Sequence, residues 1–143
     1  MGEIITNPGQ TQGVMEIADG GTGASTAFDA RENLGVAPLV PTIIADTTTA
    51  YTPDVDDVGQ IITLSNAAAT TLTLPQDSAS DIPVGSSITF IQIGAGQVTV
   101  QAGAGATLNS PGPTNKFRAQ YSTVTAIKRA ANTWVIAGDL AAS

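Results

Sequence analysis

Short runs of alternating apolar and polar residues dominate the chain after residue 60. In the run 70–75, threonines alternate with leucines, so Leu72 and Leu74 fall on one face of an extended strand. Comparable β-prone runs are separated by segments rich in glycine, proline and asparagine. These further predicted strands are 60–65, 87–93, 97–101, 104–109, 121–129 and 133–138. Short strands at such intervals predict a mainly β domain, either a β-sandwich or a small jelly roll, over residues 60–143.

Two of the predicted turns indicate hairpins. Residues 94–96 read Gly-Ala-Gly and are expected to join 87–93 to 97–101 as an antiparallel pair. Residues 130–132 are expected to close a last hairpin between 121–129 and 133–138. Trp134 lies in the final strand, where a single tryptophan is expected to anchor the core.

The segments before residue 60 are less regular. Residues 1–19 are expected to form an extended arm, because proline and glycine interrupt any regular element. This arm either docks the protein onto a larger assembly, or is a disordered tail or an arm that wraps its own trimer. Its apolar residues, the candidate docking contacts, are Ile4, Ile5, Val14, Met15 and Ile17. Residues 37–59 are expected to be a connector with β-prone stretches at 40–45 and 47–52, because three prolines exclude a central strand.

Residues 20–36 predict a glycine turn followed by one short helix. Gly20, Gly21 and Gly23 supply backbone conformations that a β-carbon disfavours. Thr26 is the expected N-cap and Gly35 the expected left-handed residue after the helix. Helical spacing brings several small and apolar residues near one another, and a helix this short needs a covering partner. These candidate contact residues are Ala27, Phe28, Ala30 and Leu34.

The segment 20–36 resembles a linker module of bacteriophage tail-fibre and related virion proteins. In that family the letters GGTGA precede a small-residue helix that ends in Asn-Leu-Gly, as residues 20–24 and 33–35 do here. The resemblance implies that the helices of three chains cover one another. The alternative, from the residues alone, is a helix that packs on its own domain.

Residues 60–140 also resemble a β-domain that recurs in phage fibre proteins. The similar stretches are 84–89, 96–100, Tyr121 with Ser122, and 132–140, although their letters are mostly those of strands and glycine turns. Together the two resemblances cover most of the chain, in the order expected of a fibre protein.

Composition and charge narrow the function further. Only 4% of residues are aromatic and 12% charged, so a monomer would have a thin core and burial between subunits is favoured. The net charge of −7 and the lack of a basic face argue against binding to nucleic acid or to an anionic membrane. No apolar run approaches the ~20 residues of a membrane span.

Little in the chain indicates catalysis, a metal or a cofactor. Without histidine or cysteine, the chain cannot build a histidine-dependent triad or the usual zinc sites. Paired carboxylates could hydrolyse a glycan, but the chain has few aromatic residues with which to line a glycan-binding groove. The acidic run 54–57 lacks the glycine and terminal glutamate of an EF-hand loop, so we expect a solvated turn. We therefore expect no catalytic residues, no metal and no cofactor.

Together with the composition, the two resemblances imply a non-enzymatic homotrimer on the exterior of a phage particle. One hypothesis is a capsid decoration protein or short head fibre docked on the major capsid protein, because the chain is short and has no evident receptor-binding tip. The other is a short tail fibre or tail adaptor bound to a tail protein, with a host surface glycan as a further partner.

Overall fold

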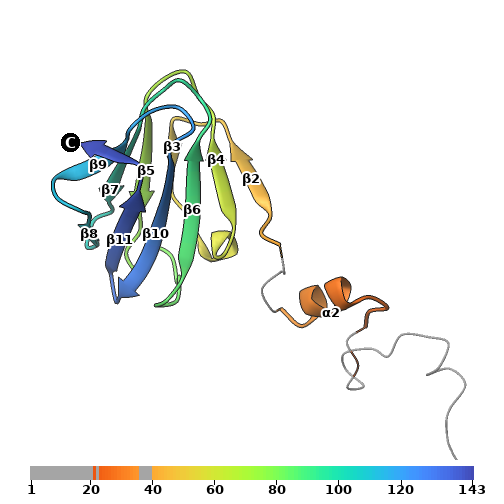
Figure 1. The fold of residues 1–143 in the computed structure, drawn as a ribbon. Coiled ribbons are helices and arrows are strands. Elements are labelled where there is room, and N and C mark those ends of the chain that lie inside the picture. The colour runs from red at the N-terminus through yellow and green to blue at the C-terminus, as the bar shows by residue number, and fades with distance from the viewer. Residues whose placement is uncertain (1–20, 22, 36–39) are drawn as a thin grey trace, which may run out of the picture. The chain divides into compact units, whose positions relative to one another are not determined.

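The computed structural model describes residues 21, 23–35 and 40–143. The chain divides into two compact units, residues 1–40 and 41–143. In the described part of the first unit, the helix α2 (Ala27–Asn33) is the regular element. The second unit is built from strands, with one short 3₁₀ helix, η2 (Val55–Asp57), after the second strand. The mainly β class predicted from the sequence is confirmed (Figure 1).

Two mixed sheets share one hydrophobic core. The six-stranded sheet has the order β2 (Ile43–Asp46), β4 (Ile61–Leu64), β6 (Ser87–Gln92), β10 (Thr123–Ala130), β11 (Thr133–Gly138) and β8 (Thr107–Asn109). The five-stranded sheet has the order β12 (Leu140–Ala142), β9 (Thr114–Phe117), β7 (Val98–Ala102), β5 (Thr70–Leu74) and β3 (Ala50–Tyr51). Buried side chains from both sheets form a single cluster, and Phe90, Phe117 and Trp134 are its largest members.

Strands β2 to β7 alternate between the sheets as the chain advances. Strands β2, β4 and β6 join the six-stranded sheet in parallel, and β3, β5 and β7 join the five-stranded sheet in parallel. The chain thus winds as a coil, with each turn stacked on the one before (Figure 1). Residues 37–59, expected to be a connector, contribute the first turn of this coil through β2 and β3.

One predicted hairpin is therefore wrong and the other is confirmed. Strands β6 and β7 belong to different sheets, so residues 94–96 cross between sheets instead of reversing the chain. The connection between β4 and β5 is the preceding crossing of the coil from one sheet to the other. A β-carbon at Gly94 or Gly96 would collide with the backbone of Asn66 or Ala68 in that crossing. Glycine is needed here for close approach of two backbones. Strands β10 and β11 do form the last antiparallel hairpin, with Ala130 opposite Thr133.

Two small strands were not predicted, because neither shows an alternation of buried and exposed residues. Strand β9 has one fully buried side chain, Phe117, and β12 has none. They pair with each other, and β9 also pairs with β7, which completes the five-stranded sheet. Backbone hydrogen bonding to neighbouring strands, rather than side-chain patterning, places these segments.

The long loop between β5 and β6 is tied down by the last hairpin. Trp134 is fully buried, as expected, and its Nε1 donates to the carbonyl of Pro75 at 2.8 Å. Lys128 is also buried: its Nζ donates to the carbonyl of Ile82 at 2.7 Å and forms an ion pair with Asp77. The ammonium also lies 5.8 Å from the centroid of the Trp134 ring. The buried lysine therefore fastens a loop that has little apolar content of its own.

Candidate interaction sites

The short helix has capped ends. The Thr26 hydroxyl accepts a hydrogen bond from the amide of Asp29 at 3.1 Å, and its carbonyl accepts from Ala30 at 3.0 Å. Thr26 is thus the N-cap, and it satisfies one of the free amides of the first turn. Gly35 follows the helix with φ +69°, the left-handed conformation that ends helices. The local chemistry of the sequence therefore defines both ends of α2.

The helix contact residues can be placed only in part. Leu34 is 54% exposed, Ala27 is exposed and Ala30 is half-buried. Gly23 adopts the left-handed φ of +65°, and Gly21 is half-buried. The side chain of Phe28, the residue Gly20 and the five apolar residues expected in the docking arm lie outside the described residues. The exposed Leu34, which directly follows the seven-residue helix, leaves apolar surface for a further partner.

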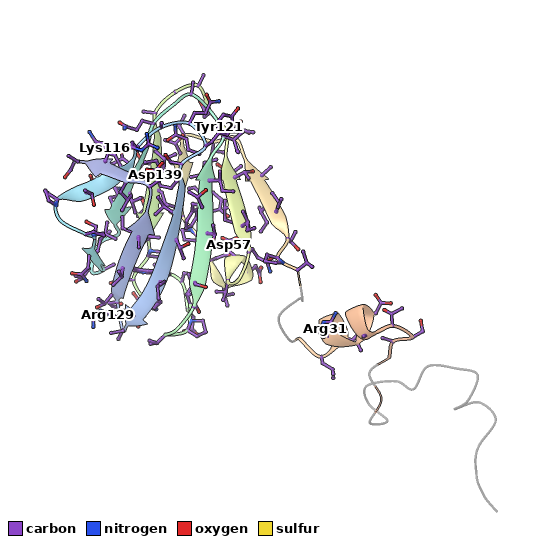
Figure 2. All side chains as sticks on the ribbon, viewed as in Figure 1. Arg31, Asp57, Lys116, Tyr121, Arg129 and Asp139 are labelled. Carbon is purple, nitrogen blue, oxygen red and sulfur yellow. The ribbon has the colours of Figure 1, made fainter. Side chains whose placement is uncertain are left out.

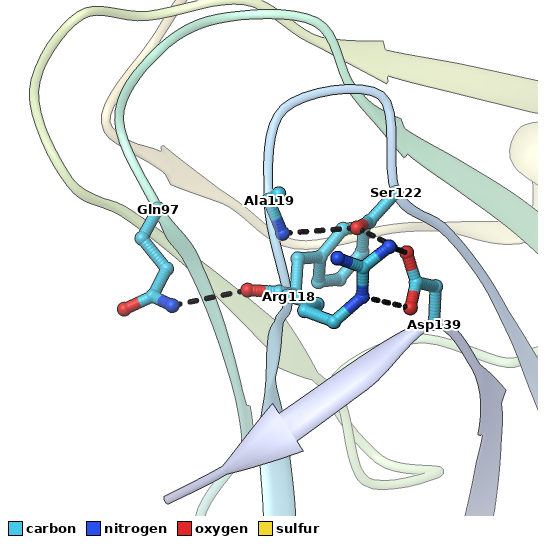
Figure 3. Close-up of polar contacts among 6 residues, drawn as sticks. Gln97, Arg118, Ala119, Ser122 and Asp139 are labelled. Atoms are coloured by element: carbon cyan, nitrogen blue, oxygen red, sulfur yellow. Dashed lines mark hydrogen bonds and ion pairs between the residues drawn. The ribbon is translucent and has the colours of Figure 1, made fainter.

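The loop 118–122 is held by a compact polar cluster. Arg118 makes two hydrogen bonds to Asp139, at 2.6 Å from Nε and 2.8 Å from Nη2 (Figure 3). The Ser122 hydroxyl donates to the same carboxylate at 2.7 Å and accepts from the amide of Ala119 at 3.0 Å. Paired, charge-assisted bonds of this kind fix orientation as well as adding attraction. The cluster joins the loop to the turn between β11 and β12.

This cluster presents Tyr121 to solvent. Tyr121 is 68% exposed and has φ +69°, an uncommon conformation for a residue other than glycine. Its amide donates to the carbonyl of Gln92 at 2.6 Å, and Gln120 donates from its side chain to Ile93 at 2.7 Å. Residues 41–143 form the β-unit. Tyr121, Asp139 and Lys116 lie at one end of this unit, and Asp57 and Arg129 lie toward the other (Figure 2). Strained conformations held by surrounding bonds are frequent at binding sites.

Sequence reasoning did not find the Tyr121 site. Its only signal in the sequence is an aromatic residue inside a polar turn. The supporting partner Asp139 is distant in sequence, and the paired bonds from Arg118 are a product of the fold.

The acidic run 54–57 is a capped 3₁₀ turn. Asp54 accepts from the amide of Asp56 at 2.9 Å, and Asp57 accepts from the amide of Asp54 at 3.0 Å. Asp57 also accepts from the Tyr51 hydroxyl at 2.9 Å. Burial, reinforced by this hydrogen bond, raises the pKa of Tyr51. These carboxylates bond to neighbouring donors, and the described residues contain no group of three acidic or metal-binding side chains that could hold a metal.

Two aspartates make the fold sensitive to acid. The hydrogen bonds from Arg118 and Ser122 lower the pKa of Asp139, and those from Lys128 and the amide of Asn132 lower the pKa of Asp77. When the pKa of an aspartate is lower in the folded than in the unfolded state, ionisation of that aspartate stabilises the fold. This stability is fully present above the unfolded aspartate pKa of about 3.9, and it is lost as the pH falls through the folded-state pKa. We expect the urea midpoint to be nearly constant from about pH 7 to 5 and to fall below about pH 4.

The control for this acid effect is Asp139→Asn. This variant should unfold more easily at neutral pH and lose less stability on acidification than the wild type. Parallel pH profiles of the two proteins would contradict the assigned role of Asp139.

Comparisons with protein-family models, with curated proteins and with solved structures found no match to this chain. No helix among the described residues is long and apolar enough to cross a membrane.

Proposed function

We propose that this protein is a structural component of a bacteriophage particle, a trimeric capsid decoration protein or head fibre. The observation that carries the proposal is the segment around α2, whose glycine turn, Thr26 cap and left-handed Gly35 give a physical role to the letters shared with phage fibre linkers. The helix has seven residues, fewer than the roughly 12–15 needed for an isolated helix, so packing between chains is the expected source of its stability.

In this proposal, each of the two units has its own role. The segment 1–19 docks the protein on the major capsid protein through its apolar residues, α2 gathers three chains, and the β-unit is displayed on the exterior. The work is binding and architecture, without catalytic turnover. Stability then depends on assembly as well as on the fold of each chain.

Immunogold labelling of purified virions tests this proposal. Antibody raised against residues 60–143 should label the head over its whole surface. Label confined to the tail would replace the head location by the alternative below, and the absence of label from intact virions would overturn the proposal.

A tail fibre or tail adaptor is the alternative, favoured by the exposed Tyr121. An exposed aromatic side chain on a fixed backbone can stack on a sugar ring or fill a receptor pocket. Tyr121→Asn should leave stability within about 1 kcal/mol, since asparagine tolerates positive φ.

If the alternative holds, Tyr121→Asn should abolish binding of the purified protein to host cells in a pull-down. Equal binding by Tyr121→Asn would remove the role of this residue. Failure of the wild type to bind cells would argue for the head location.

A further inference from the structure

The two sheets of the β-unit present different outer faces. Because alternate residues of a strand point to opposite faces, the buried positions identify the outward ones. In the five-stranded sheet, the outward row across β3, β5, β7, β9 and β12 is Ala50, Thr71, Thr99, Lys116 and Ala141. Beside it, Gln101 donates to the hydroxyl of Thr73 at 3.1 Å. This face carries polar and small side chains, as expected for contact with water.

The outer face of the six-stranded sheet carries a mixture of aliphatic and uncharged polar side chains over three rows, and the exposed Arg129 of β10 lies beyond them. These rows, together called the Ile–Thr face, are Ile43, Ile61, Thr89, Thr125 and Ala137; then Ala45, Thr63, Ile91 and Thr123; then Ser87, Ile127, Val135 and Asn109. The strands that carry them lie side by side in Figure 1. Ile43 is 65% exposed and Ile127 is 40% exposed. An apolar surface spread over neighbouring strands marks an interaction site more often than scattered exposed residues do.

We infer that the Ile–Thr face is the surface through which copies of this chain contact one another. The argument rests first on charge. The chain has a net charge of −7, so two copies repel each other wherever their carboxylates approach. The three rows contain no charged residue, which makes this face one where identical acidic chains can meet without like-charge contact. A partner recognised by opposite charge would instead be met by charged groups.

Side-chain stiffness favours the covering of this face. Most members of the Ile–Thr face are isoleucine, valine or threonine, whose branched β-carbons restrict rotation. Little side-chain entropy is therefore lost when such a face is covered. Burial of the aliphatic side chains provides the attraction, at about 25 cal/mol per Å² of apolar surface removed from water. The threonine hydroxyls can remain bonded within the face, as Thr89 and Thr125 are at 3.4 Å.

This inference rests on the proposed self-association and names the surface that performs it. The first test is light scattering of the full-length chain, comparing wild type with Ile91→Glu. A glutamate at Ile91, which belongs to one of the three rows, would place an unpaired carboxylate from every copy in the contact, so dissociation should increase on the order of 100-fold. Thr71→Glu is the matched control, since Thr71 is also half-buried and outward-facing on an inner strand, but in the other sheet. It should leave the measured mass unchanged.

A second measurement keeps the test decisive if Ile91→Glu does not fold. The chain has no cysteine, so Ile91→Cys and Thr71→Cys each supply a single thiol. A bulky maleimide should modify Ile91→Cys more slowly at assembling concentrations, and Thr71→Cys at an unchanged rate. An oligomer with equal modification rates, or one that Ile91→Glu does not weaken, would overturn this inference but leave the proposed trimer standing. A monomeric wild type would overturn both, and the virion labelling would still test particle location.

Discussion

Adding a single methyl group at Gly96 is expected to lower the free energy of unfolding by about 2–3 kcal/mol. The β-carbon of Gly96→Ala would collide with the backbone of Ala68, in the preceding crossing of the coil. Gly96 itself donates from its amide to the carbonyl of Asn66 at 2.9 Å, so the two crossings cannot separate without losing that bond. Because the obstacle is backbone rather than a flexible side chain, relaxation requires the stacked turns to move apart.

Gly103→Ala is the matched control for this prediction. Both glycines lie in turns, and neither has the positive φ that would strain an alanine. At Gly103, however, the nearest atom to an added β-carbon is the carbonyl oxygen of Leu74 at 3.2 Å. Its stability should change by less than about 1 kcal/mol. Urea unfolding of both variants at one protein concentration measures the difference, and equal losses of stability would contradict the stacked-turn explanation.

Replacing Trp134 by alanine is expected to have the largest effect of any single substitution, about 3–5 kcal/mol. The tryptophan is the largest fully buried side chain of a core that has few other aromatic residues. The loss leaves a cavity and removes the surface beneath the Lys128 ammonium. It also leaves the carbonyl of Pro75 without its indole donor.

Trp134→Phe separates packing from hydrogen bonding. Phenylalanine retains most of the apolar volume but has no group that donates to Pro75, so we expect a smaller loss of about 1–2 kcal/mol. Limited proteolysis should show the loop 75–86 becoming more sensitive in this variant than the rest of the β-unit. A phenylalanine variant as unstable as the alanine one would indicate that the hydrogen bond, rather than the buried volume, dominates.

If both predictions hold, the β-unit is a rigid support for its surfaces. The stacked crossings fix the β2–β7 coil, and the Trp134 and Lys128 contacts fasten the largest loop to the final hairpin. The two candidate surfaces, the Tyr121 loop and the Ile–Thr face, are both carried by strands or turns of this support. A protein that acts by binding benefits from such preorganisation, because less motion is lost on contact.

The sequence by itself determined the local features of this protein. Alternation in 70–75 identified the buried face of β5, on which Leu72 and Leu74 are fully buried. Thr26 and Gly35 marked the ends of α2, because capping depends on the residue and its immediate neighbours. The last hairpin was also predictable, since its strands are adjacent in sequence and joined by a short turn.

Only the tertiary structure decided which strands are neighbours. Alternation reports that one face of a strand is buried, but it carries no information about the strand beside it. The glycines at 94 and 96 were therefore interpreted as a hairpin turn, whereas the fold uses them to bring two crossings into contact. The Arg118–Asp139 pair and the uncharged Ile–Thr face are also invisible in the sequence, because each joins residues that only the pairing of distant strands brings together.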